Sequence, residues 1–230
     1  KEREIKNFIS KSSYKLIGIF QNEQGVKLKA ELNEKYYSVE EVKNFLEKNY
    51  NSIFNISSID KKPAKKSPTP PFTTSTLQQE ASRKLGFGVT RTMSTAQKLY
   101  EAGLITYMRT DSVTISNEAK SSIVQKIESK YGEDYVNIRD YKNKNKSAQE
   151  AHEAVRPTDI NIEEITSDYD QQRLYHLIWK RTISSQMSDA QIERTVVNIK
   201  SDSYNEFFVA RGEVIKFDGF LRVYNEGTDD

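Results

Sequence analysis

A proline-rich basic segment constrains the fold of this chain more than any other feature. Residues 61–71, KKPAKKSPTPP, hold four of the five prolines in the 230-residue sequence. Proline has no backbone N–H and restricts the residue before it, so we expect no helix and no central strand to continue through this segment. The sequence therefore predicts an extended connector or a domain boundary here.

The residues before the connector and those at the end of the chain have strand character. Apolar and charged side chains alternate over residues 26–32, which predicts a half-buried strand, and residues 13–20 predict a second strand that forms a hairpin with it. Ser38 followed by Glu41 matches the capping box that begins a helix. Residues 192–214 are again rich in β-branched and aromatic side chains, which predicts further strands.

The middle of the chain has helical character instead. Apolar residues repeat there at helical spacing in four segments: 75–85, 92–102, 116–131 and 168–187. Residues 104–107 predict a short strand or an extended run between the second and third of these helices. We therefore expect an α+β fold in which a mainly helical domain, residues 70–191, is inserted into a discontinuous β-rich arch domain, residues 1–69 and 192–230.

The composition excludes several classes of protein. Cysteine is absent and there are two histidines, which excludes disulfides, zinc fingers, iron–sulfur sites and thiol catalysis. No apolar run approaches the ~18 residues of a membrane span. The first residues, KEREIKNFIS, have no apolar signal segment, and we expect a cytoplasmic protein.

Positive charge is concentrated in one part of the chain. The formal net charge is only +2, but residues 61–111 hold nine Lys and Arg against three Asp and Glu. This distribution is consistent with a local anionic partner or, alternatively, with a solvated connector that has no binding role.

Tyr107 and Arg109 form the first candidate catalytic pair. In an extended segment their side chains point to the same side. A nearby cation favours the phenolate form of a tyrosine, and an arginine fork can hold two oxygens of a phosphate. The pair is therefore suited to nucleophilic attack on a phosphodiester, although any single one of the thirteen tyrosines is more often a packing residue.

His152 and Arg156 form the second candidate group. If residues 152–156 form a helical turn, the two side chains are neighbours, and Pro157 ends the turn. Such a pair can donate to a phosphodiester or protonate a leaving oxygen. The pattern His-Glu-x-x-His of zinc proteases is not completed here.

The amino-acid sequences of these two segments are long and specific. Residues 70–112, PPFTTSTLQQEASRKLGFGVTRTMSTAQKLYEAGLITYMRTDS, closely resemble the type IA DNA topoisomerases, and in particular the bacterial topoisomerase I branch. The later AQEAHEAVRPTDI, residues 148–160, resembles the histidine motif of the same family, in the expected order and spacing. The resemblance implies a fragment that spans the β arch and the tyrosine-bearing domain. Two short helices, residues 75–85 and 92–102, followed by an extended run indicate that this domain is winged-helix-like.

The resemblance also implies roles for the candidate residues. Tyr107 matches the nucleophile that cleaves one strand of single-stranded or underwound DNA, which leaves a 5′-phosphotyrosine and a free 3′-hydroxyl. Arg109 matches the arginine at the scissile phosphate, His152 the histidine near the backbone phosphates, and Arg156 is a secondary candidate for a phosphate contact. Because the covalent link conserves the bond energy, strand passage and religation, which relax negative supercoils, need no ATP.

The family holds Mg²⁺ in an acidic domain that this chain does not contain. We therefore assign no metal ligand here and expect no cofactor in the chain alone. We expect the remaining domains of the full-length enzyme to bind the magnesium and to complete the gate through which a DNA strand passes. The isolated chain is expected to be inactive, and no membrane contact is expected.

Two other functions compete with this interpretation. A tyrosine recombinase requires a histidine and two arginines before the nucleophile, whereas His152 and Arg156 follow Tyr107. A non-enzymatic, winged-helix-like DNA-binding module would use the basic residues of the helices 75–85 and 92–102, namely Arg83, Lys84, Arg91 and Lys98, to contact phosphates.

Overall fold

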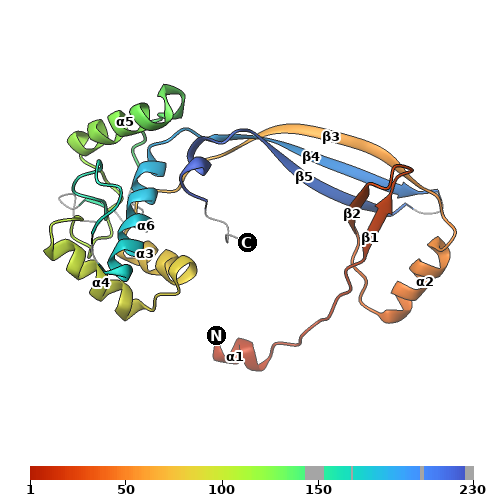
Figure 1. Cartoon of the computed structure of the whole chain (residues 1–230). Helices are drawn as coiled ribbons and strands as arrows, with labels where there is room; N and C mark the ends of the chain where they lie inside the picture. Colours follow the sequence, from red (N-terminus) through yellow and green to blue (C-terminus); the bar gives the residue numbers. More distant parts are fainter. Residues whose placement is uncertain (143–152, 167, 203–204, 226–230) are drawn as a thin grey trace. The chain divides into compact units, whose positions relative to one another are not determined.

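The chain folds into two compact units (Figure 1). The computed structural model describes residues 1–142, 153–166, 168–202 and 205–225. The first unit, here called the β unit, comprises residues 1–64 and 192–215, and the second, the helical unit, comprises residues 65–191 and 216–230. The boundaries fall inside three strands, β3 (Phe54–Lys66), β4 (Ala190–Ser201) and β5 (Phe207–Phe217). The fold is α+β, as the sequence predicts.

A five-stranded sheet with the order β1-β2-β5-β4-β3 forms the framework of the β unit. The hairpin predicted at its start is confirmed: β1 (Ile17–Gln21) pairs antiparallel with β2 (Lys27–Leu32), with Ile17 opposite Glu31. Gly25, in the turn between them, has a φ of 82°, a conformation that glycine adopts without steric cost. A short helix, α1 (Glu2–Lys6), precedes the hairpin.

One helix covers part of this sheet. The helix α2 (Val39–Asn49) begins with the predicted capping box, in which Ser38 Oγ accepts the N–H of Glu41 at 3.2 Å and Glu41 Oε2 accepts the N–H of Ser38 at 3.0 Å. Phe45 of α2 packs against Phe208 of β5, with ring centroids 6.2 Å apart. The small core that results contains six buried residues: Ala30, Leu32, Phe45, Ile199, Phe208 and Ala210.

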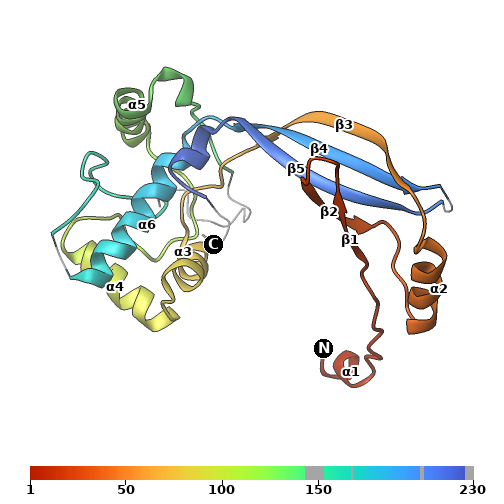
Figure 2. The ribbon, with the colours of Figure 1, turned by 45° about the vertical axis from the view of Figure 1, so that its right-hand side comes forward.

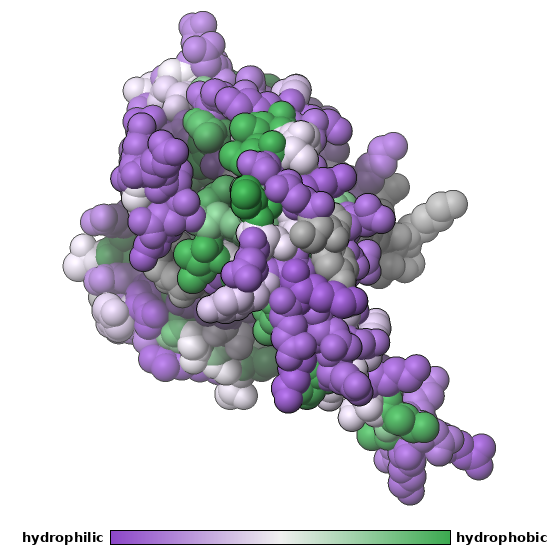
Figure 3. Space-filling model, turned by 90° about the vertical axis from the view of Figure 1, so that its right-hand side faces the viewer, coloured by the Kyte–Doolittle hydropathy of each residue, from purple (hydrophilic) through white to green (hydrophobic). Residues whose placement is uncertain are grey.

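Many apolar side chains of the β unit lie outside that core. Ile19, Ile53 and Ile56 are each more than half exposed. Figure 3 shows hydrophobic side chains interspersed with hydrophilic ones on one face of the molecule. The β unit therefore buries only part of the apolar surface that its sequence supplies.

The proline-rich segment is more regular than the sequence predicts. β3 continues through Pro63 to Lys66, so residues 61–66 form a strand, while the division between the two units, after Ala64, falls within the segment predicted as a connector or domain boundary. β3 is an edge strand of the sheet, and an edge strand tolerates a residue that has no N–H to donate. Residues 67–71 lie outside any strand.

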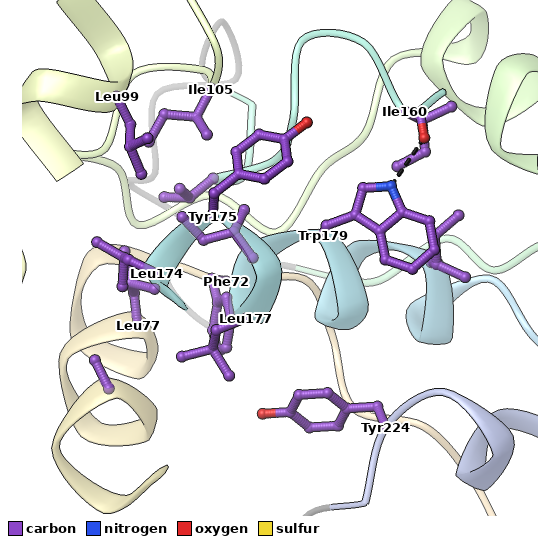
Figure 4. Packing of buried hydrophobic residues seen from close by; sticks show 14 of the residues in the cluster. Phe72, Leu77, Leu99, Ile105, Ile160, Leu174, Tyr175, Leu177, Trp179 and Tyr224 are labelled. Atoms are coloured by element: carbon purple, nitrogen blue, oxygen red, sulfur yellow. Dashed lines mark hydrogen bonds between the residues drawn. The ribbon is translucent and has the colours of Figure 1, made fainter. Parts of the chain in front are cut away.

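The helical unit is built around one long helix, α6 (Tyr169–Ser185). Its residues from Leu174 onward are largely buried, and Figure 4 shows Leu174, Tyr175, Leu177 and Trp179 among the buried side chains of the unit. The indole N–H of Trp179 donates to the carbonyl oxygen of Ile160 at 2.8 Å. These contacts agree with a packing role for this helix.

Three other helices complete this unit (Figure 2): α3 (Thr74–Glu80), α4 (Val89–Glu101) and α5 (Asn117–Tyr131). A π-helical turn, Ala81–Leu85, extends α3 and ends at Gly86, whose φ is 68°. Both α3 and the long α6 contact α4. Two 3₁₀ turns, Glu133–Tyr135 and Gly219–Arg222, complete the regular structure. Among the described residues, no helix is long and apolar enough to cross a membrane.

The winged-helix description stays a prediction. The helices α3 and α4 follow one another as predicted, but residues 104–107 form no strand. Ile105 makes a single antiparallel bridge to Pro157 instead. The local backbone is therefore held by isolated contacts rather than by a ladder of strand hydrogen bonds.

The end of the described chain belongs to the helical unit, and not to the β-rich domain in which the sequence analysis placed residues 216–230. Phe220 and Tyr224 are each at most 5% exposed and lie in the core of the helical unit. Gly219 starts this segment with a φ of 51°, and the next N–H, of Phe220, donates to the carbonyl oxygen of Ser188 at 2.9 Å. The sequence pattern missed this because two apolar residues in a short turn give no periodic signal.

We expect Gly219→Ala to destabilise the helical unit by about 1–3 kcal/mol. A Cβ at this position would lie 2.5 Å from the carbonyl oxygen of Ser188 and 2.7 Å from backbone atoms of Asp189, in a left-handed conformation. Urea unfolding measures the change. Gly212→Ala is the matched control, since no atom lies within 4 Å of a Cβ there, and equal unfolding midpoints for the two variants would contradict this expectation.

Candidate active site

The segment that contains Tyr107 and Arg109 alternates between buried and exposed side chains. Met108 is fully buried, and Thr110 is only 7% exposed. Tyr107 is 43% exposed, and Arg109 is also exposed. The core thus anchors the backbone on both sides of Arg109, while the phenol and the guanidinium face solvent, although the segment is not a regular strand.

The surroundings leave both functional groups accessible. The ring of Tyr107 packs edge-on against Tyr100 of α4, with centroids 5.2 Å apart and an interplanar angle of 64°. Within the part of the chain that the structure describes, neither the Tyr107 hydroxyl nor the Arg109 guanidinium makes a hydrogen bond or an ion pair. Among those residues, neither group has a partner that an anionic ligand would have to displace.

Thr106, which the sequence analysis did not single out, joins this segment to the second motif. Its N–H donates to the carbonyl oxygen of Arg156 at 2.9 Å, and its hydroxyl donates to the carbonyl oxygen of Ala154 at 2.6 Å. The same hydroxyl accepts the N–H of Arg156 at 2.9 Å. The two motifs, some fifty residues apart in sequence, are therefore adjacent in the fold.

The second motif is extended rather than helical. Val155 forms an antiparallel bridge to Phe72, and Pro157 forms one to Ile105, so the predicted helical turn is wrong for residues 153–156. Two separate backbone partners outweigh the local spacing that favoured a turn. His152, the third predicted catalytic residue, lies outside the described residues.

The guanidinium of Arg156 binds groups within the unit. Its Nη2 lies 2.6 Å from Oε2 of Glu153, and its Nη1 donates to the carbonyl oxygen of Pro157 at 2.9 Å. Glu153 also accepts the N–H of Ser116, the residue that caps α5, at 2.7 Å. Burial alone would raise the pKa of the Glu153 carboxyl, but the hydrogen bonds from Arg156 and Ser116 outweigh it and lower that pKa.

This arrangement makes Arg156 part of a structural link between the second motif and α5. The arginine also lines a pocket of about 240 Å³ at the start of that helix. A phosphate contact by Arg156 stays a prediction, and it requires phosphate to compete with Glu153 for the guanidinium.

The described residues around this segment offer no metal site. Within the described ranges there is no group of three or more His, Cys, Asp or Glu side chains that could hold a metal ion. Asp168 and Asp170 have the Asp-x-Asp spacing, but Asp168 caps α6 by accepting the N–H of Gln171 at 3.0 Å. Asp170 accepts two hydrogen bonds from Arg91, at 2.6 and 2.7 Å. These residues do not fit a magnesium site, and the requirement for Mg²⁺ stays a prediction.

Three of the four basic residues proposed for a DNA-binding module have partners in the helical unit. Arg83 binds Glu80, and Arg91 lies over the ring of Phe87, 4.3 Å from its centroid, in addition to binding Asp170. Lys84 donates to the carbonyl oxygen of Asn225. These contacts give Arg83, Lys84 and Arg91 structural roles, so the positive charge of this region is partly neutralised.

Comparisons with known proteins agree with one another. The sequence matches the family described as DNA topoisomerase over residues 1–230. It is 42% identical to "DNA topoisomerase 1 type prokaryotic" of Acanthamoeba polyphaga mimivirus over 264 residues, which covers 100% of this chain and 31% of that protein. It is also 42% identical to DNA topoisomerase 1 of Rickettsia felis over 255 residues, which covers 100% of this chain and 33% of that protein.

A solved structure shows the same similarity in three dimensions. Full-length topoisomerase I from Thermotoga maritima matches 99% of this chain with a TM-score of 0.78 and 33% sequence identity, and the match covers 38% of that protein. The chain thus spans about a third of the length of the proteins that it resembles over its whole length.

Proposed function

Because the chain belongs to the bacterial DNA topoisomerase I family, we propose that Tyr107 is the residue that cleaves DNA in the full-length enzyme. The observation that carries this proposal is the exposure of Tyr107 and Arg109 on either side of the buried Met108. The phenolic oxygen attacks the phosphorus of a single-stranded or underwound DNA strand. The phenol releases its proton to solvent as the new O–P bond forms and the bond to the 3′-oxygen breaks. The leaving 3′-oxygen takes up a proton, so a 5′-phosphotyrosine and a 3′-hydroxyl result.

Arg109 and His152 assist this step in our proposal. The Arg109 guanidinium holds two non-bridging oxygens of the scissile phosphate and stabilises the charge that develops on them. His152 contacts the neighbouring backbone phosphates or supplies the proton to the leaving oxygen. Arg156 stays a secondary candidate for a phosphate contact.

Religation follows by the reverse reaction. The 3′-hydroxyl attacks the phosphotyrosine after another strand has passed through the gap, and no ATP is needed because the phosphotyrosine retains the bond energy. We propose that Mg²⁺ and the rest of the strand gate belong to other domains, so the 230-residue chain alone neither cleaves nor relaxes DNA. The alternative, a DNA-binding module without catalysis, predicts binding without a covalent product.

The experiment that tests the proposal uses the full-length enzyme and two preparations of one single-stranded oligonucleotide, one labelled at its 5′ end and the other at its 3′ end. After denaturation, the 3′-label is expected to migrate with the protein and the 5′-label with a free fragment, because the enzyme holds the 5′-phosphate. Peptide mapping is expected to place the nucleotide on Tyr107. Retention of the 5′-label, or an adduct on a different residue, would overturn the assignment.

A further inference from the structure

We infer that Thr74 is a positioning residue for Tyr107 and Arg109, an inference that rests on the function proposed above. Thr74 is the first residue of α3 and is partly buried. It is more than thirty residues away from the candidate nucleophile in sequence, and it acts through the backbone that presents the two functional groups.

Thr74 holds the backbone on both sides of Arg109. Its N–H donates to the carbonyl oxygen of Thr110 at 2.8 Å. Its hydroxyl donates to the carbonyl oxygen of Met108 at 2.7 Å and accepts the N–H of Thr110 at 2.8 Å. A single side chain thus fixes the residue before and the residue after the arginine.

The element that carries Thr74 is itself well anchored. Thr73 and Thr76 form a capping box, in which Thr73 Oγ1 accepts the N–H of Thr76 at 3.3 Å and Thr76 Oγ1 accepts the N–H of Thr73 at 2.9 Å. Leu77, in the next turn of the same helix, is fully buried in the core. The hydroxyl of Thr74 therefore has a fixed position relative to the core, as a residue that supports a reactive group requires.

A second threonine anchors the other end of the same loop. Thr106 is bound to Ala154 and Arg156, and Thr74 is bound to Met108 and Thr110. The stretch from Tyr107 to Arg109 lies between these two anchors. Loss of the Thr74 hydroxyl removes its bonds to Met108 and to the Thr110 N–H and leaves only the backbone bond to the Thr110 carbonyl. Arg109 can then shift relative to Tyr107, and a displacement of about 1 Å in a reacting group can cost about 10²-fold in rate.

The test compares Thr74→Val and Thr74→Ser in the full-length enzyme. Valine keeps the shape of threonine but removes the hydroxyl, whereas serine keeps the hydroxyl. We expect Thr74→Val to slow covalent adduct formation on saturating single-stranded DNA by about 10-fold or more, with DNA affinity within about twofold of wild type. We expect Thr74→Ser to restore the rate to within about threefold of wild type.

Thr90→Val is the matched control, since Thr90 is an exposed residue of α4, and it is expected to leave the rate unchanged. All rates are compared at a temperature at which circular dichroism shows every variant to be folded. If valine at position 74 prevents folding, Thr74→Ala replaces it and carries the same expectation.

The outcomes separate this inference from the proposed function. A wild-type rate in Thr74→Val, together with no adduct in Tyr107→Phe, would overturn the positioning role alone. A slow Thr74→Ser variant would also overturn it, because the hydroxyl would then not be the cause. An adduct that persists in Tyr107→Phe would instead overturn the proposed function.

Discussion

Tyr107→Phe in the full-length enzyme is expected to abolish the covalent capture of DNA, with no adduct detected above about 0.1% of the wild-type level. Phenylalanine keeps the aromatic ring, and therefore the edge-on contact with Tyr100, but removes the oxygen that forms the bond to phosphorus. The measurement is denaturing electrophoresis of the enzyme after incubation with a labelled single strand. Folding is expected to be preserved because the Tyr107 ring is 43% exposed and its hydroxyl supports no contact among the described residues.

Tyr100→Phe is the matched control for this variant. Its side chain is 40% exposed and belongs to the same ring pair, so any effect of losing a hydroxyl from that pair should appear here as well. We expect Tyr100→Phe to form the adduct at a rate within about threefold of wild type. If Tyr107→Phe and Tyr100→Phe formed the adduct to the same extent, the role of Tyr107 as the nucleophile would be wrong. DNA binding without an adduct in the wild-type enzyme would favour the binding-module alternative.

Arg109→Gln is expected to lower the rate of adduct formation by about 10²-fold or more, without lowering the stability of the fold. The arginine is exposed and makes no ion pair within the described residues, so its removal leaves no buried charge without a partner. Its loss does remove the cation that holds the phosphate and stabilises the charge developing on it. Single-turnover cleavage at saturating DNA measures the rate, and thermal unfolding measures the stability.

Arg156→Gln provides the contrasting control, because the Arg156 guanidinium is bound within the helical unit, whereas that of Arg109 is exposed. Its guanidinium binds Glu153, whose side chain is 29% exposed, so the variant leaves a half-buried carboxylate without its cation. We expect the free energy of unfolding to fall by about 1–3 kcal/mol, a loss that Arg109→Gln is not expected to show. A loss of salt-dependent DNA affinity at unchanged stability would show instead that Arg156 contacts phosphate in the complex.

The local features of the fold were predictable because they depend on residues close together in sequence. The hairpin at residues 17–32 and the capping box of Ser38 and Glu41 follow from alternation and from side-chain chemistry over a few residues. The start of α5 at Ser116 was predictable for the same reason. The extension of β3 through Pro63 was not predictable, because proline is tolerated only where a strand lies at the edge of a sheet, and strand order is a tertiary property.

The candidate site likewise has some features that were predictable from the sequence and others that were not. The sequence by itself determined the family to which the chain belongs and singled out Tyr107 and Arg109 as candidates, because both depend on residue types in a long and specific order. Only the tertiary structure decided that Arg156 binds Glu153, that Thr74 and Thr106 hold the loop, and that Phe220 and Tyr224 complete the helical core. The physical reason is that such contacts join residues far apart in the chain, and which donor meets which acceptor is settled only when the core brings the segments together.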